Sequence, residues 1–255
     1  MRKRNPIVIL AAGFVLGVAA AGAARAAGPD PKAVALADQV MEALGGEKAW
    51  AATRYLRFDW AVERDGKTVV KRSHTWDKYT GDYRLEGKTK DGKAYTVVMN
   101  LNTRQGKAVL DGKPLEGEAL KKQLESGYGA WVNDGYWLIM PYKMKDPGVA
   151  LALDGEEKTP EGEWDKLRLA FESVGLTPKD RYWAYVNRKT HLVDRWDFIL
   201  QDEKGPASTF LWKGWKKHGN VMLADDRVDP KDGTRIHFPV LEVPASIPEA
   251  AFTTP

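Results

Sequence analysis

Few side chains in this sequence have the residue types and spacing that acid–base chemistry requires. Histidine titrates near neutral pH, and a carboxylate that orients it can make it a general base. His191 precedes Asp194 by three residues, and His74 precedes Asp77 by the same spacing. Three residues along a strand place two side chains on opposite faces, so either pair would need a turn to meet. Both are therefore predicted to be surface histidines rather than catalytic pairs.

Other catalytic and cofactor-binding patterns do not occur in the sequence. The chain has no cysteine, which excludes disulfides, thiol nucleophiles and iron–sulfur clusters. None of the serines lies in a Gly-x-Ser-x-Gly elbow, and no His-Glu-x-x-His motif occurs. Gly127-Tyr128-Gly129 lacks the third glycine of a phosphate-binding loop. We expect no cofactor.

The densest group of carboxylates lies near the C-terminus. It comprises Asp225, Asp226, Asp229 and Asp232. Their spacing fits no EF-hand loop, and Pro230 with Gly233 favours a turn between two strands. The group is predicted to be a solvated hairpin, and we expect no metal site.

The N-terminus has the three parts of a secretory signal peptide. Arg2, Lys3 and Arg4 precede an apolar run over residues 7–24, which ends at Ala24-Arg25-Ala26. The run is just long enough to span a bilayer, so an uncleaved anchor is the alternative. Its high glycine and alanine content favours cleavage near Ala26/Ala27. The sequence therefore predicts a signal peptide over residues 1–26 and a periplasmic mature chain.

The excess of positive charge belongs to this leader. The whole chain has 39 basic and 35 acidic residues, and the leader contains four basic residues and no acidic one. The mature chain is thus formally neutral, and it has no global field that would attract phosphates. We expect no nucleic-acid partner.

The rest of the chain changes from a helical period to an alternating one. Asp30 can cap a helix that continues through Leu44. Alternation then predicts five hairpin-linked strands between residues 53 and 110, with turns at Asp65-Gly66 and Asp111-Gly112. A second alternating series runs from residue 151 to residue 240.

The segment between the two series has no alternating pattern. A short helix is predicted from Glu116 to Leu124, and Asp134-Gly135 reads as a turn before the apolar run Tyr136–Tyr142. That run is interpreted either as a buried helix end or strand, or as an apolar strap at the rim of a cavity.

These elements predict a mainly β fold with one domain over residues 27–255. About ten or eleven antiparallel strands would form a single curled sheet, a half-open barrel. Its strands carry aromatic residues on both faces, so we expect the N-terminal helix and the mid-chain helix to pack on the concave face.

The aromatic content exceeds what a core of this size needs. The chain has ten tryptophans, nine tyrosines and seven phenylalanines, and a cavity lined by several of them is a plausible use of the surplus. An error of one residue in register would exchange the two faces of any strand. The predicted lining residues are Phe58, Trp60, Trp76, Tyr83, Met99, Trp137, Met140, Trp196, Phe198 and Trp212.

Two internal strings resemble a family of secreted bacterial proteins whose function is not characterised. They are Tyr136–Val149 (YWLIMPYKMKDPGV) and Leu176–Phe198 (LTPKDRYWAYVNRKTHLVDRWDF). The Gly-Gly-x-x-x-Trp at 45–50 and the closing Phe252-Thr253-Thr254-Pro255 are similar to the ends of that family. The family is itself similar to the outer-membrane lipoprotein-sorting carriers of the LolA/LolB type. The resemblance implies a half-open β-barrel of about eleven strands, covered by helices, with an apolar cavity for acyl chains.

The leading hypothesis is a periplasmic, non-enzymatic binding protein that holds a lipid, an acylated protein or another hydrophobic ligand in an apolar cavity. Lipoprotein acyl chains and transient contacts with envelope membrane proteins are the partners that this implies. One alternative is a secreted hydrolase or lyase acting on an envelope polymer, centred on His191, Asp194 or Asp146. Another is an envelope module that binds a protein partner through exposed aromatic residues.

Overall fold

A computed structural model describes residues 30–171, 177, 179–201 and 203–255. The predicted signal peptide, residues 1–26, lies outside the described residues. The helices are α1 (Pro31–Ala43), α2 (Gly46–Ala52), α3 (Gly117–Ile139) and α4 (Ala250–Thr253), with a 3₁₀ turn η1 (Met140–Lys143). The strands are β1 (Tyr55–Arg64), β2 (Lys67–Asp77), β3 (Asp82–Lys88), β4 (Ala94–Asn100), β5 (Gly106–Leu110), β6 (Lys113–Pro114), β7 (Val149–Thr159), β8 (Gly162–Phe171), β9 (Arg181–Asn187), β10 (Val193–Ile199), β11 (Ser208–His218), β12 (Val221–Val228), β13 (Arg235–His237) and β14 (Leu241–Glu242).

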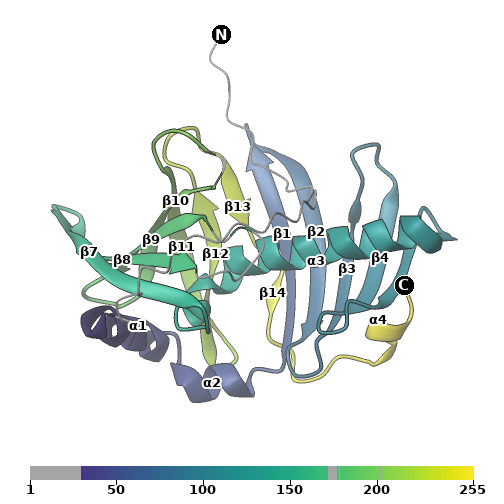
Figure 1. Ribbon diagram of the computed structural model, residues 1–255, viewed down its shortest axis with the longest axis horizontal. Helices are drawn as coiled ribbons and strands as arrows, with labels where there is room; N and C mark the ends of the chain where they lie inside the picture. The colour runs from purple at the N-terminus through teal and green to yellow at the C-terminus, as the bar shows by residue number, and fades with distance from the viewer. Residues whose placement is uncertain (1–29, 172–176, 178, 202) are drawn as a thin grey trace, which may run out of the picture.

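The strands form one antiparallel sheet that curls without closing (Figure 1). Its order is β6-β5-β4-β3-β2-β1-β13-β12-β11-β10-β9-β8-β7, and β14 pairs with β1 beside β13. The predicted single curled antiparallel sheet is confirmed. The described part has fourteen strands rather than ten or eleven. Two of them, β6 and β14, have only two residues each and are too short to show an alternating pattern.

The first helix forms where its capping residues predict it. The Asp30 carboxylate accepts a hydrogen bond from the Lys32 backbone N–H (3.0 Å), and Pro31 occupies the first turn. Leu36 and Val40 are buried on the face that packs toward β7 and η1. The second Asp30 oxygen accepts from the backbone N–H of Leu153 on β7 (3.1 Å). The cap therefore also fixes α1 to the edge of the sheet.

The mid-chain helix is longer than the sequence predicts. α3 runs without interruption from Gly117 to Ile139 and crosses the strands on one side of the sheet (Figure 1). Asp134-Gly135, predicted as a turn, lies inside this helix. Its apolar positions recur at Leu120, Leu124 and Trp131, and this stripe packs on the sheet. Tertiary packing thus overrides a local turn signal.

α3 covers two apolar clusters on the concave face. Its N-terminal half lies on Tyr83, Leu85, Val97 and their neighbours on β3–β5. Its C-terminal half joins the larger cluster, which includes residues of β1 and β8–β13. α3 therefore covers β3–β5 and reaches the larger cluster, to which α1 and η1 also contribute buried residues.

The outer face of the sheet carries the C-terminal segment. Arg84 on β3 points away from α3 and donates to the backbone carbonyl of Thr254 (2.7 Å). α4 accordingly packs on β3 and β4 from the side opposite α3. α3 and α4 thus lie on opposite faces of β3 and β4.

We predict that two glycines of α3 respond in opposite ways to alanine. A Cβ at Gly129 meets nothing within 4 Å, so Gly129→Ala should raise the free energy of unfolding by about 0.5–1 kcal/mol. A Cβ at Gly127 would lie 3.3 Å from Cγ1 of Val97 and 3.6 Å from Sδ of Met99. Gly127→Ala should therefore gain less or lose stability. Urea denaturation of both variants tests this; a larger gain at Gly127 would contradict the packing of α3 on β4.

Candidate functional site

The ten predicted lining residues all lie in the two apolar clusters beneath α3. Tyr83 and Met99 belong to the cluster on β3–β5, Trp76 packs against both clusters, and the other seven belong to or pack against the larger cluster. Sheet register places Phe58 beside His74 and Trp60 beside Arg72. The predicted lining residues are therefore side chains of the apolar interior in the described structure. Whether these side chains contact a ligand remains a prediction.

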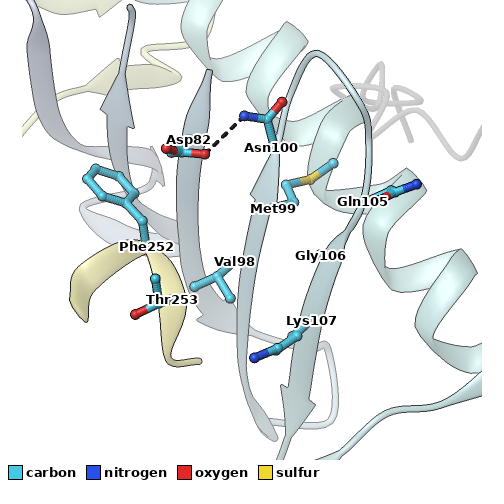
Figure 2. Close-up of a pocket in the computed structure, with 9 residues that line it drawn as sticks. All are labelled: Asp82, Val98, Met99, Asn100, Gln105, Gly106, Lys107, Phe252 and Thr253. Atoms are coloured by element: carbon cyan, nitrogen blue, oxygen red, sulfur yellow. Dashed lines mark hydrogen bonds between the residues drawn. The ribbon is translucent and has the colours of Figure 1, made fainter. Parts of the chain in front are cut away.

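Two hollows in the described part of the chain lie outside the aromatic interior beneath α3. One, of about 260 Å³, lies on the outer face between α4 and β3–β5; Figure 2 shows it with Asp82, Asn100 and Phe252 at its walls. The other, of about 290 Å³, lies between α1 and the start of β7. Neither is the predicted apolar cavity. In the described arrangement the aromatic side chains beneath α3 pack against one another.

The run Tyr136–Tyr142 is the C-terminal turn of α3 followed by η1. Trp137 is 8% exposed and Met140 is fully buried, so of the two interpretations the described arrangement has the buried helix end. The ring centroid of Trp137 lies 4.7 Å from that of Trp196 and 4.9 Å from that of Phe210. Trp137 is thus as much a core residue as Trp196, because both rings fill the same space between α3 and β10.

A charged network lies where α3 crosses β2. The Arg72 guanidinium donates through Nε and Nη2 to the two carboxylate oxygens of Asp134 on α3, at 2.6 and 2.7 Å. Nε2 of His74 lies 3.0 Å from Asp134 Oδ2, and Nδ1 lies 2.7 Å from the Tyr83 hydroxyl. Because the carboxylate can only accept, Nε2 carries a hydrogen, and in neutral His74 the Tyr83 hydroxyl donates to Nδ1. The ring of His74 stacks on Phe58 at 4.4 Å.

Burial and charge compete in this network. Burial alone would raise the pKa of Asp134, but Arg72 and His74 outweigh it and hold that pKa below the ordinary value. Burial lowers the pKa of His74, and Asp134 only partly opposes this. The network therefore keeps an ionised carboxylate and a guanidinium together inside an apolar face, with a neutral imidazole beside them.

A second buried arginine lies on the same face, and none of the residues in the described ranges gives it a carboxylate partner. Arg227 on β12 is fully buried, and its guanidinium carbon lies 3.5 Å from the ring centroid of Trp212. Nη2 donates to the backbone carbonyl of Trp137 on α3 (2.9 Å), and Nη1 donates to the carbonyl of Asp226 (3.0 Å). Nε has no hydrogen-bond partner among the described residues. Burial lowers the pKa of Arg227 to about 9.

Several other polar atoms on this face have no hydrogen-bond partner in the described part of the chain. They are the indole N–H groups of Trp60, Trp76, Trp196 and Trp212 and the hydroxyl of Tyr136. A buried donor left unsatisfied costs about 1–3 kcal/mol, and each such group calls for an explanation. Their concentration beneath α3 makes the concave interior the candidate site.

The alternative enzyme hypothesis rests on His191, Asp194 and Asp146. No contact among the described residues brings these three side chains together. One oxygen of Asp194 accepts from Trp164 Nε1 (2.8 Å) and from Asn187 Nδ2 (2.7 Å). His191 lies in the β9–β10 turn with a positive φ of 54°, and Asp146 pairs with Lys143 after η1. These partners give Asp194 and Asp146 structural roles in a hairpin and a turn.

The acidic group near the C-terminus is a hairpin, as predicted. Asp225 and Asp226 lie on β12, where they pair with Lys216 and Arg235. Asp229 and Asp232 lie in the following turn, where their carboxylates accept backbone N–H groups at 2.8 Å.

Sequence reasoning missed the network of Arg72, His74 and Asp134. His74, predicted to be a surface histidine, is fully buried, so that prediction is wrong. Alternation along β2 places Arg72 and His74 on the same face as Val70 and Trp76, and this is the signal that could have shown them to be inward-facing. Asp134 falls on the apolar stripe that continues from Trp131 to Leu138, but this is visible only if the helix is extended through residues 134–135. The signal was present, and the turn-like Asp-Gly pair concealed it.

Comparisons with known proteins identify the fold. A scan against family models and a search of curated proteins each gave no match. The chain is similar to a solved LolA superfamily protein from Nitrosomonas europaea, with a TM-score of 0.52, 10% identity and coverage of 87% of this chain and 97% of that one. The likeness shows the fold, so the predicted LolA-like architecture is confirmed at that level.

Two further solved structures align over similar lengths. One is a DUF1329 family protein from Desulfovibrio piger, with a TM-score of 0.49, 13% identity and coverage of 87% of this chain and 97% of that one. The other is a domain assigned to the outer-membrane lipoprotein-sorting proteins of Vibrio parahaemolyticus, with a TM-score of 0.47, 9% identity and coverage of 87% and 96%.

We predict that Asp134→Asn is strongly destabilising. It leaves the Arg72 guanidinium buried without its counter-charge, which costs about 3–5 kcal/mol. Glu242→Gln is the matched control, because Glu242 pairs with Arg57 at 2.9 Å while both side chains are half exposed. That change should cost less than about 1 kcal/mol. Urea denaturation compares the two, and equal small losses would contradict the role assigned to the buried pair.

The histidine of the network should make stability depend on pH. The pKa of His74 is lower in the folded protein than its ordinary 6.5, so the unfolded chain binds the proton first as pH falls. Its contribution is fully present above pH 6.5 and is lost progressively below it, by at most about 1.4 kcal/mol per pH unit. His74→Gln should flatten the fall in unfolding free energy between pH 7 and pH 5.

His237, whose pKa is also lowered by burial, should keep part of the slope in the His74→Gln protein. His237→Gln is therefore the matched control, and the double variant should be the flattest of the set. An unchanged slope in His74→Gln would show that this imidazole is not held neutral by the fold.

Proposed function

We propose that the chain is a periplasmic, non-enzymatic binding protein that holds a lipid, an acylated protein or another hydrophobic ligand on the concave face of its sheet. The observation that carries this is the wide aromatic face of the sheet on which α3 packs. The LolA-like fold supports it. Burial of ligand surface would supply the affinity, at about 25 cal/mol per Å² of apolar area.

Entry of a ligand requires α3 to move. The aromatic side chains beneath it pack together, with Trp137 against Trp196 and Trp76 against Trp131 at 5.5 Å. An acyl chain would replace the apolar stripe of α3 on the same aromatic surface. The predicted lining residues are proposed to contact the ligand in that open form.

The composition of α3 suits it to such a movement. Its interior contains Gly127, Gly129 and Gly135, and each glycine lowers helix stability by about 1 kcal/mol relative to alanine. The helix therefore depends on its packing and on a few polar contacts to stay in place. Two of these are the Arg72–Asp134 pair and the hydrogen bond from Arg227 to the Trp137 carbonyl.

Location in the envelope is part of the proposal. The leader over residues 1–26 is proposed to direct secretion and to be removed near Ala26/Ala27. Among the described residues, none of the helices is both long enough and apolar enough to cross a bilayer. Lipoprotein acyl chains are the proposed natural ligand class, with transient contacts to envelope membrane proteins at loading and release.

We predict saturable binding of the neutral fluorescent probe 1-N-phenylnaphthylamine, with displacement by hexadecanol. If only the open form binds, apparent affinity scales with the population of that form. Asp134→Asn weakens the hold on α3 and should raise the affinity for the probe by about tenfold or more. Glu242→Gln, which breaks an exposed pair, should leave it unchanged.

Two outcomes would count against the proposal in different ways. Absence of saturable probe binding to the wild type would remove the proposed function. Saturable binding that Asp134→Asn leaves unaltered would show that ligand does not enter beneath α3.

A further inference from the structure

The charge beneath α3 is unbalanced. Two guanidiniums, those of Arg72 and Arg227, lie on the concave face, and Asp134 is the carboxylate that meets one of them. The neighbouring acids of Arg227 on β12 are already engaged, because Asp225 pairs with Lys216 and Asp226 with Arg235, each at 2.6 Å. Arg227 is thus a buried cation whose described partners are backbone carbonyls.

The two arginines differ in a specific way. Arg72 uses the edge formed by Nε and Nη2 to hold both oxygens of Asp134. The same edge of Arg227 has an Nε without a partner and an Nη2 bonded to the Trp137 carbonyl. This edge matches a carboxylate or phosphate, which two parallel N–H donors bind best. Stacking on Trp212 at 3.5 Å holds the guanidinium plane in place.

We propose that the ligand of the concave interior is an acyl compound with an acidic head group, a carboxylate or a phosphate, and that this group pairs with Arg227. The inference rests on the proposed function, and it names the class of ligand. Movement of α3 withdraws the Trp137 carbonyl and frees Nη2. The head group then occupies the Nε–Nη2 edge and supplies the missing negative charge.

The acyl chain has an apolar path from that point. Arg227 on β12 lies beside Trp212 on the adjacent strand β11. The ring centroids of Trp212 and Trp196 lie 5.9 Å apart. Trp196 in turn contacts Phe198 and Tyr182 at 5.5 and 5.1 Å. The head group would thus lie near the middle of the sheet, with the chain over the aromatic residues of β9–β11.

The test compares ligands that share a sixteen-carbon chain and differ in the head group. Hexadecanol, hexadecanoate, hexadecyl phosphate and hexadecylamine are used to displace 1-N-phenylnaphthylamine from the purified protein. We expect at least one acid to bind the wild type about tenfold or more tightly than hexadecanol, and the amine to bind least well. Tighter binding of hexadecanoate would identify a fatty-acid-like ligand, and tighter binding of the phosphate a phospholipid-like one.

Variants assign the preference to Arg227. Arg227→Met should reduce the acid preference, measured as the ratio of acid affinity to hexadecanol affinity, to within about twofold. Because this variant also loses the hydrogen bond to the Trp137 carbonyl that holds α3, its affinity for hexadecanol itself should be equal to or higher than that of the wild type. Removal of an uncompensated buried charge should also leave thermal stability equal or higher. Arg227→Lys, which keeps the charge and loses the two-donor edge, should lie between the two. Arg57→Gln, an exposed arginine on the outer face of β1, should behave as the wild type.

The outcomes separate this inference from the function on which it rests. If probe and hexadecanol bind but the acids show no advantage, or if the advantage survives in Arg227→Met, the inference is overturned and the binding function stands. If Arg227→Met does not fold, Arg227→Lys is the test, and an acid preference equal to that of the wild type would overturn the inference. If neither the probe nor any of the four ligands binds the wild type, the proposed function fails and the inference with it.

Discussion

The buried pair between Arg72 and Asp134 fixes how this molecule is assembled. An apolar stripe alone would allow α3 to shift along the sheet by a turn, because leucines and tryptophans pack with little directional preference. Asp134 interrupts that stripe with a charge, and the two hydrogen bonds to Arg72 at 2.6 and 2.7 Å are satisfied in one register. A misplaced helix would bury both charges apart, which costs far more than a small loss of apolar contact.

The Arg72–Asp134 pair also lies between the two apolar clusters of the interior. On one side, the N-terminal half of α3 packs on β3–β5 through Leu120, Leu124 and Trp131. On the other, Trp137 and Leu138 join the larger cluster. His74 and Tyr83 extend the polar contact into the sheet between the two. The helix is therefore held at a polar point near its C-terminal third, while its apolar halves make contacts that an acyl chain could replace with similar energy.

The sequence predicts most of the sheet because its signals are local. Asp65-Gly66 and Asp111-Gly112 have positive φ at both residues, as two-residue hairpin turns require, and the strands beside them alternate as expected. Asp134-Gly135 is the same dipeptide, but it lies within α3, where packing against the sheet determines the backbone conformation. The inward faces of β1 and β2 were also predictable. The pairing of Arg72 with a residue sixty-two positions away was not, since neither periodicity nor spacing carries that information.

Arg227 makes the same kind of aromatic contact as Arg72 but differs from it in its charged partner. Both guanidiniums lie over a tryptophan ring, Arg72 over Trp60 at 4.4 Å and Arg227 over Trp212 at 3.5 Å, so cation–π contact is common to both. Among the described residues, Arg72 has a carboxylate partner and Arg227 has none, and burial lowers the pKa of Arg227 to about 9. The acidic head group that we propose would supply at Arg227 the counter-charge that Asp134 supplies at Arg72.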